Sequence, residues 1–181
     1  MEFQIVQFFN QLGRGSILDN ITIWFSYIPF LIILWLALAI ILIYVDKKDG
    51  KVIFFSIVFA VLIYFLVNDF FFKTILVDNM GIRLRPYLAH PGEIIALGTR
   101  FADSSFPSGH VASSVAVLSI ISYFYRKAWP VCLAFVLFMM FARMHMGMHY
   151  PSDVLAGAGL GLIYSALGIW ISKKILKKTL K

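Results

Sequence analysis

Long uncharged apolar stretches alternate with short polar segments along almost the whole chain. The first extends from Ile21 to Val45, which exceeds the roughly 20 residues that a helix needs to cross a bilayer. Two later stretches are short; the first becomes long enough if its helix begins at Ser108, and the second is expected to continue toward Met146. About five transmembrane helices are therefore predicted: Ile21–Val45, Val52–Phe72, Val111–Tyr125, Trp129–Ala142 and Val154–Ile171.

An amphipathic segment precedes these stretches. Ile5, Phe9 and Leu12 recur at helical spacing with glutamines between them. This pattern predicts a helix over residues 2–13 that lies on the membrane surface.

The apolar stretches fill most of the length, so a separate soluble domain has no room. Residues 1–181 are predicted to form one all-α membrane helix bundle, with residues 77–107 as its long outer loop. Within the last stretch, the spacing of Gly157 and Gly161 favours close contact with a neighbouring helix.

Composition supports a membrane protein and excludes other classes. The chain is 61% hydrophobic and only 14% charged, far from the usual composition of soluble domains. Its single cysteine, Cys132, excludes a disulfide framework. The net charge of +7 does not indicate nucleic-acid binding, because the basic residues sit at the ends of apolar stretches and not on one face.

These basic residues are divided unevenly between the two sides that five crossings create. Ten of the sixteen lie on the side of the C-terminus: Lys47, Lys48, Lys51, Arg126, Lys127, Lys173, Lys174, Lys177, Lys178 and Lys181. The other six are Arg14, Lys73, Arg83, Arg85, Arg100 and Arg143. Because cytoplasmic segments carry the excess of positive charge, the C-terminus is predicted to be cytoplasmic. The polar segments between the helices would then face the exterior of the cell membrane.

The first polar segment reads FPSGHVASS, residues 106–114. Pro107 and Gly109 interrupt regular structure, and Ser108 is a favourable N-cap for the helix that follows. His110 would lie in the first turn of that helix. A helix N-terminus offers unpaired N–H groups and a partial positive charge, so this segment predicts an anion site.

The second and third polar segments add a histidine–aspartate pair and arginines. Asp153 follows His149 by four residues, and a carboxylate there can accept an imidazole N–H and fix the tautomer of the ring. Arg143 ends the fourth apolar stretch, while Arg83 and Arg85 lie in the long outer loop, just before Pro86. The planar guanidinium fork suits the oxygens of a phosphate.

Together the three segments supply what phosphoryl transfer requires. That reaction needs charge stabilisation around the phosphoryl group, an in-line nucleophile and an acid for the leaving oxygen. Arginines, a helix N-terminus and two histidines can fill these roles without a metal ion or other cofactor. All lie at helix ends on one membrane face, which predicts a lipid phosphate as the substrate.

Other interpretations of the same residues remain open. His145, His149 and Asp153 could ligate a metal ion if one helix carried all three, but Gly147 and Pro151 argue against a continuous helix. Structural alternatives are a helix cap for His110, lipid anchoring for Arg83 and Arg85, an ion pair for Asp69 and Lys73, and solvated loop charge for His90, Glu93 and Arg100.

The polar segments resemble the signature of type 2 phosphatidic acid phosphatases, a family of integral-membrane lipid phosphatases. The signature has three parts: K-x6-R-P, P-S-G-H and S-R-x5-H-x3-D. Here Pro107–His110 reproduces the second part, and Arg143-x5-His149-x3-Asp153 reproduces the third, with Ala142 at the serine position.

The first part of the signature is incomplete. Arg85–Pro86 matches, but Asp78 stands where the family has lysine. Either Lys73 takes that role, displaced by an insertion, or Arg83 replaces it; Lys73 is favoured.

The resemblance implies a mechanism through a phosphohistidine. His149 would attack phosphorus with Asp153 orienting it, and His110 would protonate the leaving oxygen before water releases phosphate. His149 must then be neutral and His110 protonated in the same complex. The phosphate oxygens would be held by Arg85, Arg143, Ser108, the backbone at Gly109, and Lys73 or Arg83.

Relatives in this family act on several lipids. Undecaprenyl diphosphate is favoured here, because the predicted site faces outward and the small chain resembles that branch. Phosphatidylglycerophosphate and lipid A phosphates are the alternatives within the family. A vanadate-dependent haloperoxidase, whose known examples are soluble, and a non-enzymatic lipid transporter or binding protein are the alternatives from other classes.

Overall fold

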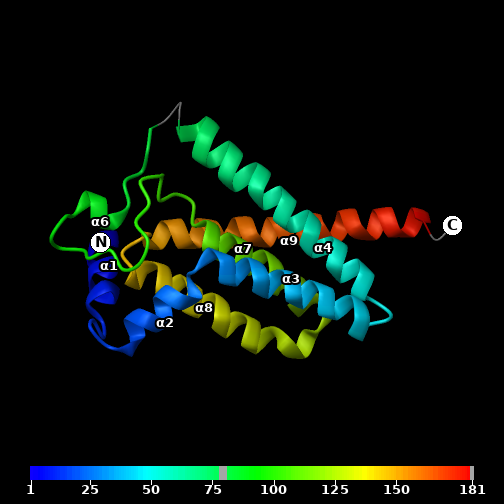
Figure 1. Cartoon of the computed structure of the whole chain (residues 1–181). Coiled ribbons are helices and arrows are strands. Elements are labelled where there is room, and N and C mark those ends of the chain that lie inside the picture. The colour runs from blue at the N-terminus through cyan, green and yellow to red at the C-terminus, as the bar shows by residue number, and fades with distance from the viewer. Residues whose placement is uncertain (78–80, 180–181) are drawn as a thin grey trace.

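The described part of the chain, residues 1–77 and 81–179 of a computed structural model, is built from helices (Figure 1). Side chains of residues 69, 73, 76 and 177–179 lie outside this description. In chain order the elements are α1 (Glu2–Gln11), α2 (Ile17–Phe25), α3 (Ile28–Val45), α4 (Gly50–Tyr64), the π-helix η1 (Phe65–Leu76), α6 (Pro86–Ala89), α7 (Gly109–Phe124), the 3₁₀ turn η2 (Arg126–Ala128), α8 (Trp129–His145) and α9 (Pro151–Thr179).

Within residues 1–77 and 81–179, four helical segments are long and apolar enough to cross a membrane, against the five predicted. They are Ile28–Val45, Gly50–Phe72, Arg126–His145 and Pro151–Leu176. The remaining predicted span, Val111–Tyr125, corresponds to α7, which has 16 residues. This is about 24 Å of helix, against about 30 Å of hydrocarbon core. The chain is therefore a multi-pass membrane protein with one shorter apolar helix.

The apolar pattern of α7 reflects contact with protein. Val111, Ala116 and Ile120 have no exposed surface, and α7 packs against α4, α8 and α9. A helix that is apolar all round is buried, and a helix surrounded by other helices need not reach both membrane surfaces itself. This explains why α7 was predicted as a span from its hydrophobicity although it is short.

The first predicted span is two helices and not one. α2 ends at Phe25, and α3 begins at Ile28, with Pro29 in its first turn. Proline has no N–H to donate and a fixed φ, so it fits the first turn of a helix but interrupts one that continues through it. The prediction of one helix over Ile21–Val45 was wrong because it considered only charge and hydropathy.

Helix α9 lies against both α7 and α4, and its glycines allow the close approach (Figure 1). A Cβ atom built on Gly161 would lie 2.5 Å from the carbonyl oxygen of Ala112 in α7. One on Gly157 would lie 2.5 Å from the carbonyl oxygen of Ser108. Close packing at these two glycines, predicted from their spacing, is confirmed.

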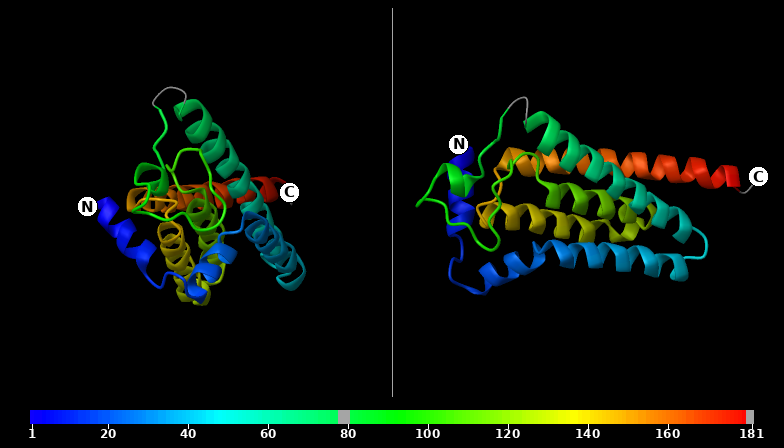
Figure 2. Two further views of the ribbon diagram at one scale, coloured as in Figure 1. Left: turned by 60° about the vertical axis from the view of Figure 1, so that its left-hand side comes forward. Right: turned by 45° about the horizontal axis from the view of Figure 1, so that its top comes forward.

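The polar segments gather at one end of the bundle (Figure 2). Helix α1, the single-turn α6 and the loop up to α7 lie at this end, whereas the α3–α4 and α7–α8 turns and the C-terminus lie at the other. The ends of the bundle thus differ in character. One carries the histidines and loop arginines, and the other carries the turns with Lys47, Lys48, Arg126 and Lys127.

Helix α1 lies across the polar end and touches α8 and α9. Its buried residues are Val6 and Asn10, while Ile5 and Leu12, predicted to form its apolar face, are 38% and 44% exposed. The predicted helix is therefore present, but its contact with protein runs along a different face. Its position on the membrane surface stays a prediction.

Candidate active site

The three polar segments are joined by backbone hydrogen bonds. The N–H of Ser108 donates to the carbonyl oxygen of Asp153 at 3.1 Å, and the N–H of Ser105 donates to that of Arg83 at 2.9 Å. Segments that are up to 70 positions apart in the sequence therefore form one unit at the polar end of the bundle.

His149 is almost fully buried, and one ring nitrogen has a defined partner. Its Nδ1 lies 2.7 Å from the carbonyl oxygen of Ser105, whereas Oδ2 of Asp153 is 3.8 Å from it. A carbonyl oxygen can only accept, so Nδ1 carries the proton and Nε2 carries the lone pair. The predicted acceptor of this proton was Asp153; in the structure the shorter contact is to a backbone oxygen.

Asp153 instead organises the start of α9. Its Oδ2 accepts the N–H of Tyr150 at 2.8 Å, as an acidic residue does three positions after an N-cap, and its Oδ1 accepts from Nη1 of Arg83. The carboxylate has no exposed surface. It therefore needs these donors to offset the loss of water, and it ties Arg83 to the helix that follows His149.

Arg85 connects Nε2 of His149 to an acidic loop residue. Its Nη1 lies 3.4 Å from Nε2 of His149 and 3.2 Å from the carbonyl oxygen of Met148. Its Nη2 donates to Oδ1 of Asp103 at 2.6 Å. The side chain is only 3% exposed, so the guanidinium is held in a fixed place beside the ring. Sequence reasoning missed Asp103.

Arg143 brings a second buried guanidinium to the same place. It is 2% exposed and within electrostatic range of Arg85 and Asp103, and its Nη1 lies 3.8 Å from the sulfur of Met146. Among the described residues, its Nε has no hydrogen-bond partner. Two guanidinium groups near one carboxylate leave an excess of positive charge, which favours an anionic ligand.

The start of α7 adds further donors. Ser108 occupies the N-cap position, but its side chain makes no capping hydrogen bond, contrary to the prediction that it caps the helix. Within the described part of the chain, the buried Ser108 hydroxyl and the side-chain amide of Asn68 in η1 have no partner. The N–H groups of the first turn thus have no side-chain cap, which leaves them as donors for an anion.

His110 lies in this first turn and faces a different environment. Its Nε2 is 3.0 Å from the carbonyl oxygen of Ser26, at the α2–α3 break. With Gly109 and Ser113 it forms one edge of an apolar groove of about 580 Å³ between α3 and α4. His110 and Tyr64 are the titratable residues that line this groove within the described part of the chain.

Lys73 and Arg83 are the two candidates for the lysine role of the first motif. The side chain of Lys73 and all of Asp78 lie outside the described residues. Arg83 is described, and its guanidinium binds Asp153, Ser152 and Glu2. Its charge is therefore already balanced by two carboxylates.

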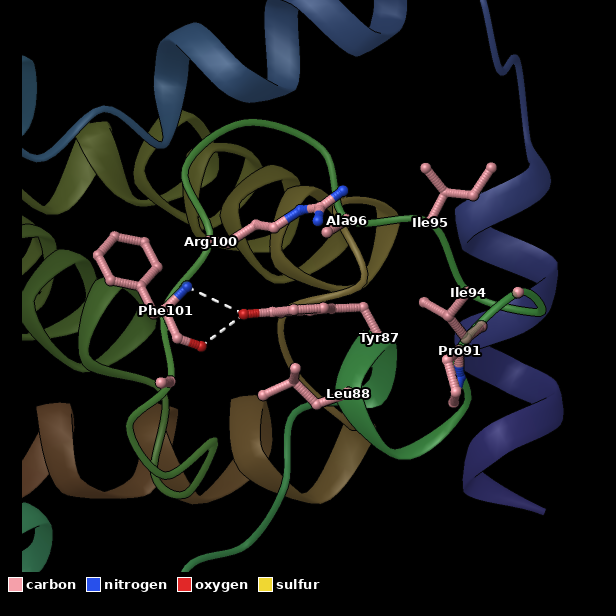
Figure 3. A pocket seen from close by; sticks show the side chains of 10 residues that line it. Tyr87, Leu88, Pro91, Ile94, Ile95, Ala96, Arg100 and Phe101 are labelled. Carbon is pink, nitrogen blue, oxygen red and sulfur yellow. Dashed lines mark hydrogen bonds between the residues drawn. The ribbon is translucent and has the colours of Figure 1, made fainter.

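A second cavity, of about 540 Å³, lies in the outer loop (Figure 3). The hydroxyl of Tyr87 accepts the N–H of Phe101 at 2.9 Å and donates to its carbonyl oxygen, which closes the loop over the cavity. Arg100 lies on its wall. His90 and Glu93 are further residues of this loop, and Nδ1 of His90 lies 4.0 Å from Oε1 of Glu93.

His145 belongs to another polar cluster. Its Nδ1 is 2.8 Å from the carbonyl oxygen of Phe9, and its Nε2 is 3.0 Å from Oδ1 of Asp19. Helix α8 ends at His145 and α9 begins at Pro151. The single helix that the metal alternative required is therefore absent from the described residues.

Comparisons with known proteins point in one direction. The profile described as the PAP2 superfamily matches residues 52–177. The chain is 27% identical over 171 residues to "Undecaprenyl-diphosphatase BcrC" of Bacillus subtilis, covering 92% of this chain and 82% of that protein. It is 25% identical over 171 residues to "Bacitracin transport permease protein BcrC" of Bacillus licheniformis, covering 93% and 79%.

A solved structure has the same fold. The crystal structure of LpxE from Aquifex aeolicus aligns with a TM-score of 0.70 at 22% identity, covering 93% of this chain and 94% of that one. The arrangement of helices around the polar end is therefore shared with a known protein.

Proposed function

This chain belongs to the PAP2 superfamily of membrane lipid phosphatases, and we propose that it hydrolyses undecaprenyl diphosphate to undecaprenyl phosphate without a metal ion. The family assignment confirms the resemblance predicted from the sequence. One observation carries the mechanism. Nδ1–H of His149 donates to the carbonyl oxygen of Ser105, which leaves the lone pair on Nε2, beside the buried guanidinium of Arg85.

In the proposed first step, Nε2 of His149 attacks the terminal phosphorus. The bond between that phosphorus and the bridging oxygen breaks, and the electron pair leaves with undecaprenyl phosphate. His110 gives a proton to the leaving oxygen. In the second step, water attacks the phosphohistidine while His110 takes a proton, and inorganic phosphate is released.

Several groups would stabilise the charge on the phosphoryl oxygens. Arg85 and Arg143 supply buried guanidinium groups, and the first turn of α7 supplies the backbone N–H at Gly109 and the hydroxyl of Ser108. In a site from which water is excluded, such donors act more strongly than in water. Lys73 would approach from η1 in the lysine role of the family signature.

The groove beside His110 suits the hydrocarbon chain of the substrate. Trp35 and Ala39 of α3 and Val61 of α4 contribute to apolar walls at membrane depth, and His110 lies at the polar end. A prenyl chain in this groove would bring its phosphate oxygens to His110. The similarity to the undecaprenyl-diphosphatase of Bacillus subtilis supports the choice of this lipid.

The distribution of charge supports an exterior site. The α3–α4 and α7–α8 turns, with Lys47, Lys48, Arg126 and Lys127, lie at the end of the bundle opposite His149. Basic residues concentrate on the cytoplasmic side of membrane proteins, so the polar end would face outward.

Phosphate release from purified chain in detergent tests this function. Undecaprenyl diphosphate, a short-chain prenyl diphosphate, phosphatidylglycerophosphate and a lipid A phosphate would be compared with EDTA present throughout. We expect the highest kcat/KM for undecaprenyl diphosphate and no loss of rate with EDTA. A higher kcat/KM for another lipid would reassign the substrate, dependence on added metal would contradict the mechanism, and inactivity toward all four would favour a transporter.

Gly157→Ala is expected to lower the rate of phosphate release by about 10- to 100-fold. The added Cβ would lie 2.5 Å from the carbonyl oxygen of Ser108 and would displace the first turn of α7. A shift of about 1 Å in a catalytic group can cost about 100-fold. The matched control is Gly159→Ala, since a Cβ there meets no described atom within 4 Å beyond its chain neighbours and the backbone of its own helix. Equal rates in both variants would show that this helix contact does not position the site.

A further inference from the structure

Glu2, at the start of α1, reaches the active site from the far end of the chain. Its Oε2 accepts from Nη2 of Arg83 at 2.7 Å, and its Oε1 accepts the backbone N–H of Ser152 at 2.9 Å. Ser152 lies in the first turn of α9, next to Asp153. One carboxylate therefore binds both the loop arginine and the helix that follows His149.

Arg83 passes this contact on to Asp153. Its Nη1 donates to Oδ1 of Asp153 and to the hydroxyl of Ser152 at 2.7 Å, and its guanidinium lies 4.6 Å from the ring centre of Tyr150. All three partners belong to the segment directly after His149. The guanidinium thus has acceptors on two sides and a ring beneath it, which fixes its orientation.

The other end of α1 is also held. The side-chain amide of Asn10 donates to the carbonyl oxygens of His145 at 2.6 Å and Ile95 at 2.9 Å, while His145 contacts the carbonyl oxygen of Phe9. Val6, between the two attachment points, has no exposed surface. Helix α1 is therefore attached to the polar end of the bundle at both of its ends.

We infer that Glu2 and Arg83 are positioning residues for the reaction, and that α1 is part of the catalytic unit through the series of contacts Glu2–Arg83–Asp153. This inference rests on the proposed role of His149 as nucleophile. Arg83 then does not bind the phosphate itself; it holds Asp153 and the first turn of α9, and with them the backbone on which His149 sits. The first-motif lysine role falls to Lys73.

The charges favour the contacts of Glu2 with Arg83 and Ser152, here called the Glu2 clamp, at neutral pH. Hydrogen bonding from Ser152, together with Arg83, lowers the pKa of Glu2. The carboxylate therefore remains ionised, and the Glu2 clamp is lost only as the pH falls through the lowered pKa of Glu2. The side chain of Glu2 is 41% exposed, so its ion pair is partly screened and the effect of its loss should be moderate.

Steady-state kinetics of Glu2→Gln test the inference. Glutamine keeps the size of the side chain and an acceptor for Ser152, but loses the charge that holds Arg83. We expect kcat to fall about tenfold, with KM within about twofold of wild type, as for a lost transition-state interaction. Arg83→Gln should show the same pattern, and the double variant should be no slower than Arg83→Gln alone. Glu93→Gln, a loop carboxylate 57% exposed, is the matched control and should match wild type.

A second measurement does not depend on turnover. In nitrogen NMR of the histidine side chains, Glu2→Gln should shift or broaden the Nδ1–H signal of His149, and Glu93→Gln should not. The signal is assigned by its loss in His149→Ala.

The possible outcomes distinguish a failure of the positioning role of Glu2 and Arg83 from a failure of the proposed phosphatase function. If Arg83→Gln raises KM and the two losses multiply, Arg83 binds phosphate directly and the inference is wrong. Wild-type kcat in Glu2→Gln, or an unchanged His149 signal, would also overturn it. If the wild-type chain hydrolyses none of the tested lipids, the proposed function fails, and the NMR signal alone then decides whether Glu2 positions His149.

Discussion

Replacement of His149 by alanine is expected to abolish phosphate release from undecaprenyl diphosphate. The variant lacks the nitrogen that would form the bond to phosphorus, so only direct attack by water remains. Removing a catalytic nucleophile can cost more than about 10⁴-fold in kcat. The rate of phosphate release measures this loss. Rapid quenching in base should also trap a phosphoenzyme in the wild type and none in the variant, because phosphohistidine survives base and not acid.

His90→Ala is the matched control for this experiment. His90 lies in the outer loop, where its ring centre is 4.1 Å from that of Phe3. It should hydrolyse the lipid at nearly the wild-type rate, with phosphoenzyme formed. Substantial turnover by His149→Ala, or a phosphoenzyme trapped in it, would remove His149 from the role of nucleophile.

The sequence predicted the helices better than their ends. Apolar stretches identify membrane spans because hydrocarbon tolerates few charged side chains, and the helical parts of four predicted spans follow from this alone. Pro29 splits the first stretch, although the residue was visible in the sequence. The burial of α7 among other helices could not be predicted from the sequence, because an apolar helix has the same pattern whether lipid or protein surrounds it.

The site residues named from the sequence lie at one end of the bundle, but their partners could not be predicted. The acceptor of the His149 proton is the backbone oxygen of Ser105, and every residue carries such an oxygen. Asp103 binds Arg85 from a loop without regular spacing. Glu2 meets Ser152 from 150 positions away. The spacing within a motif predicts which side chains lie close together on one helix or turn. The contacts named here join segments that are distant in the sequence, so they depend on the tertiary fold.

Replacement of His110 by alanine is expected to lower kcat for undecaprenyl diphosphate by about 10²- to 10⁴-fold, the usual contribution of a general acid. The Nε2 proton is held by the carbonyl oxygen of Ser26 at 3.0 Å, so donation to the leaving oxygen with this bond intact needs a ring protonated at both nitrogens. The measurement that identifies the role is the dependence on the leaving group. p-Nitrophenolate leaves without a proton, and the loss of rate with p-nitrophenyl phosphate should be at least tenfold smaller than with the lipid.

Ser113→Ala provides the comparison for His110, because Ser113 lines the same groove one turn further along α7 but has no acidic proton to give. Its rate should stay near that of the wild type with both substrates. A His110 variant that loses the same factor with both leaving groups would show that the ring shapes the site without protonating the substrate. Such a result would leave the phosphohistidine intact, since its formation depends on His149, and would move the search for the acid to the other titratable groups near the groove. The leaving-group comparison therefore tests the assignment of His110 independently of the assignment of His149.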